Sequence, residues 1–388
     1  MNCFRSRFSP PATVWTISLA VTLLFFSRSS RGNLLEDSPV KFHPHLDLQA
    51  TYDDNILISS TNKLGDFSFM IRPGLQLVYG DLNRNYLSLD YTAGIEEFYR
   101  HTEFNAVNHY VTFGGKYNFS RLKLQIDHQF KDETSEDFEA GTRLQQEQNL
   151  TSASAEYNLS HYFSIGALYH QELHHFPTPG QIDNELYQPG VALYYHLSPK
   201  TDIFGEFDYG WAEVARGENQ QSETGTLGLR GKITSKITGR IGVGYQNTDY
   251  SGSSPSVDTV SASVSLHGDF TRHTFADFVV ERRINPSTTF TNNSVTTTRA
   301  DLTVNQRIYK EKFLVYLGGA YQRDEYNQPV ATGVTRTDDI WEGRAGVRYL
   351  MKKWLEFGAS YRYQHNASTA PGVSFNQDVV SVDALLHF

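Results

Sequence analysis

Two histidines and one carboxylate are spaced so that they could bind a metal ion together. His170, Glu172 and His174 are alternate residues, so in a β-strand their three side chains would lie on one face. Imidazole and carboxylate groups are common ligands of transition metals. The alternative is a polar strand end whose histidines bind no metal, and we favour it. No other cofactor is indicated.

Sequence motifs that are typical of enzymes do not occur in the chain. A nucleophile elbow, a phosphate-binding loop and a dinucleotide fingerprint are all missing. A Ser–His pair needs only spatial proximity, and nothing in the sequence indicates one. We therefore expect that the protein is not an enzyme.

The first 32 residues have the features of a secretory signal peptide. Arg5 and Arg7 precede the apolar segment Val14–Phe26, and small residues follow it. We therefore predict a cleaved signal peptide over residues 1–32 and one domain over residues 33–388. Residues 1–32 carry four arginines and no acidic residue, so the remainder has 30 basic and 43 acidic residues and a net charge of −13. Such an acidic exported chain is unsuited to binding nucleic acid.

The last ten residues predict a β-strand with one apolar face. Val380, Val382, Ala384, Leu386 and Phe388 would share one side, and mostly polar residues the other. The terminal aromatic residue resembles the C-terminal signature of bacterial outer-membrane barrels, whose last strand pairs with the first. This resemblance implies that Phe388 is a membrane-insertion signal for the barrel assembly machinery.

Turn signals divide the rest of the chain into hairpins. Short polar turns, such as Asn118–Arg121 and Thr234–Lys236, alternate with longer polar stretches, such as Asn327–Thr337. The pattern predicts an all-β fold, a transmembrane antiparallel up-and-down β-barrel of about 18 strands. A propeller would need largely apolar strands on both faces, which the chain lacks. Both termini would lie on the short-turn side, which faces the periplasm in such barrels.

The N-terminal third resembles a known family. The segment Tyr52-Asp53-Asp54-Asn55 and the strand pattern of residues 71–91 are similar to the putative beta-barrel porin family, type two. This resemblance implies a bacterial outer-membrane barrel. Some members accompany loci for exopolysaccharide production and export, so polysaccharide or its export apparatus are expected partners, together with outer-membrane lipid and lipopolysaccharide.

Charged residues on the predicted inner face suggest a way to select solutes. Basic residues prevail in the second half of the chain and acidic residues in the first half. A barrel with one basic and one acidic wall has a transverse field that orients polar solutes. Alternatively, these residues pair with neighbours across strands. The pore-lining candidates are Arg299, Arg307, Arg344, Arg348 and Arg362, opposed by Asp90, Glu96, Glu206 and Asp208.

The acidic stretch Asp132–Glu139 is predicted to be a solvated loop outside the cell, or one that contacts lipopolysaccharide through divalent ions. No loop is long enough to be expected to fold inward, so the wall itself would provide any selectivity. The first hypothesis for function is a passive channel or export conduit for polar solutes such as saccharides. The second is a closed barrel that binds surfaces or anchors polysaccharide, and an outer-membrane enzyme is the least favoured.

Overall fold

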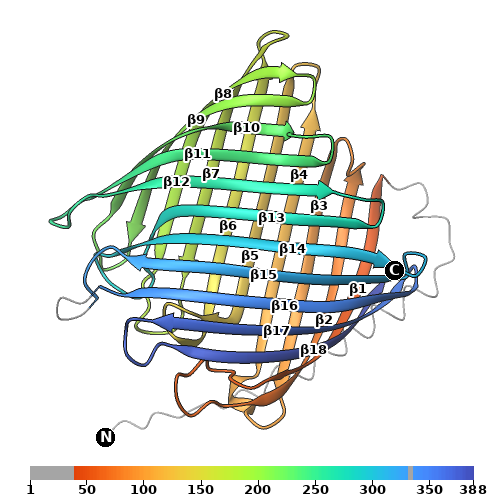
Figure 1. The fold of residues 1–388 in the computed structure, drawn as a ribbon, viewed down its shortest axis with the longest axis vertical. Coiled ribbons are helices and arrows are strands. Elements are labelled where there is room, and N and C mark those ends of the chain that lie inside the picture. Colours follow the sequence, from red (N-terminus) through yellow and green to blue (C-terminus); the bar gives the residue numbers. More distant parts are fainter. Residues whose placement is uncertain (1–38, 331–334) are drawn as a thin grey trace, which may run out of the picture. The chain divides into compact units, whose positions relative to one another are not determined.

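The computed structural model describes residues 39–330 and 335–388, and residues 42–388 form one compact unit. The predicted signal peptide lies outside the described residues. Eighteen strands and one short 3₁₀ helix, Thr102–Phe104, follow one another along the chain (Figure 1). The strands are β1 (Val40–Asp53), β2 (Asp66–Gly80), β3 (Tyr86–Phe98), β4 (Ala106–Asn118), β5 (Leu122–Asp137), β6 (Thr142–Asn158), β7 (Phe163–His175), β8 (Asn184–Ser198), β9 (Thr201–Val214), β10 (Gln220–Lys232), β11 (Ile237–Tyr250), β12 (Val257–Asp269), β13 (Thr274–Pro286), β14 (Ser294–Ile308), β15 (Phe313–Tyr326), β16 (Thr337–Lys352), β17 (Leu355–Ser368) and β18 (Phe375–His387).

The strands close into a barrel. Each strand pairs antiparallel with the next one, and β1 also pairs with β18 from His45↔His387 to Asp53↔Val379. Closure leaves the sheet without an unpaired edge. The predicted barrel of about 18 strands, with its last strand paired to its first, is therefore confirmed.

The two faces of the wall differ in polarity, as the alternation predicts. On β2, Phe67, Phe69 and Ile71 are exposed on the outer face. On β9, Ile203 and Phe207 point outward, while Phe204 is buried on the inner face. An apolar outer band suits contact with lipid, and a polar inner face suits a lumen. No helix among the described residues is long and apolar enough to cross a membrane.

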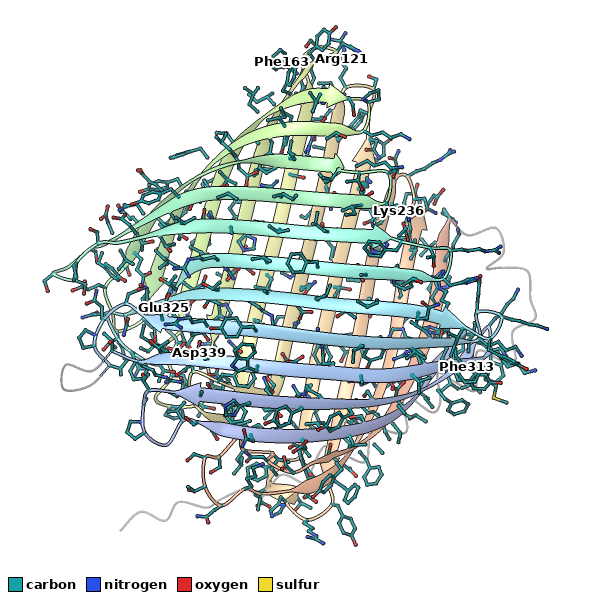
Figure 2. The ribbon with its side chains drawn as sticks, viewed as in Figure 1. Arg121, Phe163, Lys236, Phe313, Glu325 and Asp339 are labelled. Carbon is teal, nitrogen blue, oxygen red and sulfur yellow. The ribbon has the colours of Figure 1, made fainter. Side chains whose placement is uncertain are left out.

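Short turns and longer connections lie at opposite ends of the barrel. The short turns, marked by Arg121, Phe163, Lys236 and Phe313 in Figure 2, follow the top and right of the view. Glu325 and Asp339, at the end of β15 and the start of β16, lie on the left, at the other end. The C-terminus lies with the short turns (Figure 1). We call the other end the long-loop end.

The stretch Asp132–Glu139 is not a solvated loop, and this prediction was wrong. β5 pairs with β4 only as far as Asp132, and β6 pairs with β7 only as far as Glu147. From there to the turn the two strands pair only with each other, from Glu133↔Gln146 to Asp137↔Thr142. We call residues 133–146 the hairpin tip. It leaves the wall and folds inward, because its contacts are with β17, β18 and the β13–β14 connection on other sides of the barrel.

Apolar burial is concentrated at the long-loop end. The buried side chains there come from the hairpin tip, from connections and from the adjacent strand ends, and include Ile56, Ile58, Leu144, Phe176, Ile182, Ile284, Val295, Tyr326, Ile340 and Phe375. β13 contributes by leaving β12 beyond Arg282. Burying apolar side chains is the main stabilising contribution in water. The connections at this end are therefore packed against one another.

Candidate functional site

The centre of the site is a buried carboxylate at the turn of the hairpin tip. Glu139 accepts hydrogen bonds from the Thr288 main-chain N–H at 3.1 Å, the Thr288 hydroxyl at 2.9 Å and the Thr289 N–H at 3.2 Å. The Ser287 hydroxyl also donates to it. We call Ser287–Thr289, in the β13–β14 connection, the cradle. Burial raises the pKa of the Glu139 carboxyl.

A buried arginine holds the main chain of the hairpin tip. The guanidinium of Arg336 donates to the carbonyl oxygens of Phe138 at 3.0 Å and Glu139 at 2.9 Å. It also forms an ion pair with Asp338 at 2.6 Å, and only 2% of Arg336 is exposed. A buried arginine is stable only where its donors are satisfied, as they are here by two carbonyls and a carboxylate. The turn is thus fixed to the start of β16.

Two further contacts join the hairpin tip to β17 and β18. Glu136 accepts hydrogen bonds from Gln377 Nε2 at 2.8 Å and from Arg362 at 3.3 Å. The ring of Phe138 stacks on Phe375, with the centroids 5.8 Å apart. Because β13, β16 and β18 lie across the barrel from β5, the hairpin tip crosses the mouth.

The base of the hairpin tip is held by neighbouring strands. Arg143 forms an ion pair with Glu96 on β3, and the Thr134 N–H donates to Asn108 Oδ1 on β4 at 3.0 Å. On the other side, Gln146 and His174 of β7 are joined at 2.9 Å. The hairpin tip is thus anchored at its base and at its turn.

Between the hairpin tip and the short turns the lumen contains a cavity of about 580 Å³. Hydroxyl and amide side chains dominate its inner surface, with a few charges. These groups both donate and accept hydrogen bonds, as hydroxyl-rich solutes require. Its lining includes Gln125, Asp127, Ser152, Ser154, His170, Gln188, Glu206, Asp208, Ser222, Thr224, Arg240, Gln246, Ser261, Ser263, Ser265, Glu281 and Arg283.

Three of the predicted pore-lining arginines pair with nearby carboxylates. Arg299 lies 3.1 Å from Asp301, which also binds Arg344. Arg344 lies 3.2 Å from Glu342. Arg348 reaches Glu356 at 3.7 Å and Asp383 at 3.6 Å. These contacts agree with the interpretation that the charges pair across neighbouring strands.

The other two predicted arginines lie at opposite ends of the wall. Arg362 contacts Glu136 of the hairpin tip, as described above, and so takes part in closing the mouth. Arg307 lies near the short turns, with its guanidinium 5.1 Å from the centre of the Phe275 ring. Arg307 is therefore remote from the hairpin tip.

The predicted acidic residues are also placed beside partners. Asp90 lies 3.9 Å from His45, Glu96 binds Arg143, and Glu206 lies 2.9 Å from Arg240. Asp208 lines the cavity over Gly190, where an added Cβ would stand 2.0 Å from its Oδ1. Pairing on both sides weakens a transverse field. Whether these residues sort solutes remains a prediction.

The three residues of the suggested metal site do lie together. Glu172 is 2.7 Å from His170 and 3.8 Å from His174, but it also forms an ion pair with Arg283 at 2.8 Å. Arg283 already supplies the positive charge that a metal ion would bring. Over the part of the chain that the structure describes, no group of three or more His, Cys, Asp or Glu residues is arranged to hold a metal ion.

Comparison with known proteins adds a family. Solved Pseudomonas aeruginosa proteins are similar to the chain: the outer-membrane protein OpdK has 11% identity over 90% of this chain and 99% of its own, with a TM-score of 0.47. OccK2 (OpdF), solved in complex with glucuronate, has 10% identity over 91% and 99%, with a TM-score of 0.48. No curated protein matches. The family model described as "Putative beta-barrel porin 2" matches residues 41–388, nearly the whole chain. The chain therefore belongs to the Putative beta-barrel porin 2 family and is a porin-like β-barrel of the bacterial outer membrane.

Proposed function

We propose that the protein is a passive channel or export conduit for polar solutes such as saccharides, with its outer mouth narrowed by the hairpin tip. The polar cavity in the lumen is the observation that supports this proposal most. Its serine, threonine and glutamine side chains can exchange hydrogen bonds with sugar hydroxyls. The lumen offers no arrangement that we can assign to an enzyme, and we infer that the protein is a channel instead.

Single-channel recording in a planar bilayer tests this function. We expect purified wild-type protein to give small, discrete current steps, because the hairpin tip crosses the mouth of a barrel large enough for an aqueous channel. Bilayers that receive only detergent are the control. If neither the wild type nor a variant with a shortened hairpin tip conducts, the barrel is not a channel.

The packed long-loop end favours one alternative function. Its buried apolar side chains would also suit a closed barrel that binds or anchors polysaccharide at the cell surface. Such a barrel would bind polysaccharide without conducting. Conductance therefore separates the two functions.

We infer an orientation from the two unlike ends of the barrel. Short turns face the periplasm and longer loops face outward in bacterial outer-membrane barrels. Both termini would then be periplasmic, after removal of residues 1–32. Lipopolysaccharide at the long-loop end, the barrel assembly machinery, and polysaccharide or its export apparatus are the partners that fit this orientation.

Replacing Arg344 and Arg348 by serine should shift ion selectivity toward cations. The two arginines neutralise Asp301, Glu342, Glu356 and Asp383, and their loss leaves four carboxylates with fewer partners. Reversal potentials under a salt gradient measure the shift. The control is Arg272→Ser in an exposed short turn, which should leave selectivity unchanged. An unchanged reversal potential in a conducting double variant would mean that these arginines do not influence permeating ions.

A further inference from the structure

The cradle is a complete binding site for a carboxylate group. Both oxygens of the Glu139 carboxylate accept hydrogen bonds, one from the Ser287 hydroxyl and the Thr289 N–H, the other from the Thr288 N–H and hydroxyl. Successive main-chain N–H groups in a turn form an anion-binding concavity, and bonds to a charged acceptor are stronger than neutral ones. The cradle is filled by a side chain that comes from 148 to 150 residues away.

The segment that brings Glu139 to the cradle can move without breaking the wall. Residues 133–146 have no ladder partner on β4 or β7, so the closed sheet stays intact if the hairpin tip swings away. The contacts that would be lost are those of the cradle, of Arg336, and of Glu136 and Phe138 with β17 and β18. Hydrogen bonds of this kind each contribute only about 1 kcal/mol net, so a competing ligand can shift the balance.

We propose that the cradle is a carboxylate-binding site for solutes, that Glu139 occupies it in the closed form, and that a small carboxylate solute exchanges with Glu139 and releases the hairpin tip. The inference rests on the proposed channel function, because it makes that channel respond to its solute. A neutral sugar lacks the two charged acceptor oxygens that the cradle donors require. The ligand class is therefore small organic carboxylates, including sugar acids.

Arg336 gives the site its positive charge. It is buried beside the hairpin turn and holds the Phe138 and Glu139 carbonyl oxygens, while Asp338 balances its charge. When the turn moves away, two of its donors lose their acceptors. A solute whose oxygens reach from the cradle toward Arg336 would satisfy them, so a hydroxylated carboxylate should release the turn better than acetate does.

A cysteine at Ala140, at the hairpin turn, reports its release. The experiment uses full-length protein in which the only native cysteine, Cys3, is replaced by serine, and it measures the rate of maleimide labelling in detergent. D-glucuronate and D-glucose are compared because their rings differ only in the carboxylate. We expect glucuronate to raise the labelling rate severalfold in a saturable way and glucose to leave it unchanged.

Two variants of Glu139 test the latch, and each must first show the heat-modifiable migration of a folded barrel. Glu139→Ala removes the carboxylate, so labelling should be fast without glucuronate. Glu139→Gln keeps the size but directs an amide NH₂ at main-chain N–H donors, so labelling should also rise. The matched control is Glu103→Gln, an exposed residue in the β3–β4 connection, which should behave as the wild type.

The outcomes separate the inference from the channel function. Equal labelling rates with glucuronate and glucose, or wild-type rates in both folded Glu139 variants, would overturn the inference even if the barrel conducts. A glucuronate-dependent rate in a barrel that never conducts would leave the carboxylate site standing and refute the channel.

Discussion

Shortening the β5–β6 hairpin should raise the single-channel conductance severalfold. Replacing residues 134–145 by a short glycine-containing turn removes Glu136, Phe138 and Glu139, and with them the contacts across the mouth. The wall should survive, because the pairs of β5 with β4 and of β6 with β7 end before the deleted segment. Conductance in planar bilayers measures the effect.

A matched deletion shows whether the effect is specific to the hairpin tip. The β11–β12 connection, residues 251–256, lies at the same end of the barrel and makes contact with Glu218 of the next connection. Shortening it should leave the conductance close to that of the wild type. Equal conductance in all three proteins would show that the hairpin tip does not limit the current.

Deleting Phe388 should strongly reduce the amount of assembled barrel. The Phe388 N–H donates to the Pro44 carbonyl oxygen at 3.0 Å, and its exposed ring follows the outward residues Val380 and Val382 of β18. β18 closes the sheet against β1, so a fault here leaves two unpaired strand edges. The heat-modifiable fraction in outer-membrane preparations measures assembly.

Phe388→Tyr is the control for that deletion. It keeps an aromatic ring at the last position and should assemble nearly as well as the wild type. A deletion variant present at wild-type levels in the outer membrane, and still heat-modifiable, would contradict the role of Phe388 as an insertion signal.

The barrel could be predicted from the sequence because its determinants are local. A wall strand must place apolar residues on one face and polar residues on the other, so period-two alternation is visible in segments such as Phe67–Ile71. Short turns also carry their signal in a few adjacent residues, as at Asn118–Arg121. Strand number and closure then follow from counting.

The inward hairpin could not be predicted in the same way, because its determinants are distant. Asp132–Glu139 is acidic, and acidic segments are usually solvated. What buries Glu139 is a set of donors at Ser287–Thr289, far along the chain. One signal was available: β5 and β6 have 16 and 17 residues, more than the roughly 9–11 that cross a bilayer. Phe138, an aromatic residue within the acidic stretch, was a second.

The charges of the lumen show the same limit. Their inward direction follows from alternation, but their partners depend on register. Arg348 meets Asp383 from two strands away, and Arg283 meets Glu172 from a non-adjacent strand. Counting charges along the sequence therefore suggested two opposed walls where the structure has paired clusters.

Osmotic swelling of liposomes tests the central claim, that this barrel lets small polar solutes pass through a narrowed mouth. Liposomes containing the purified wild-type protein are diluted into isosmotic solutions of sugars of increasing size. We expect swelling with the smallest sugars, a sharp fall with disaccharides, and a shift of this limit to larger sugars when the hairpin tip is shortened. No swelling with any sugar, for both the wild-type and the shortened protein, would contradict the account.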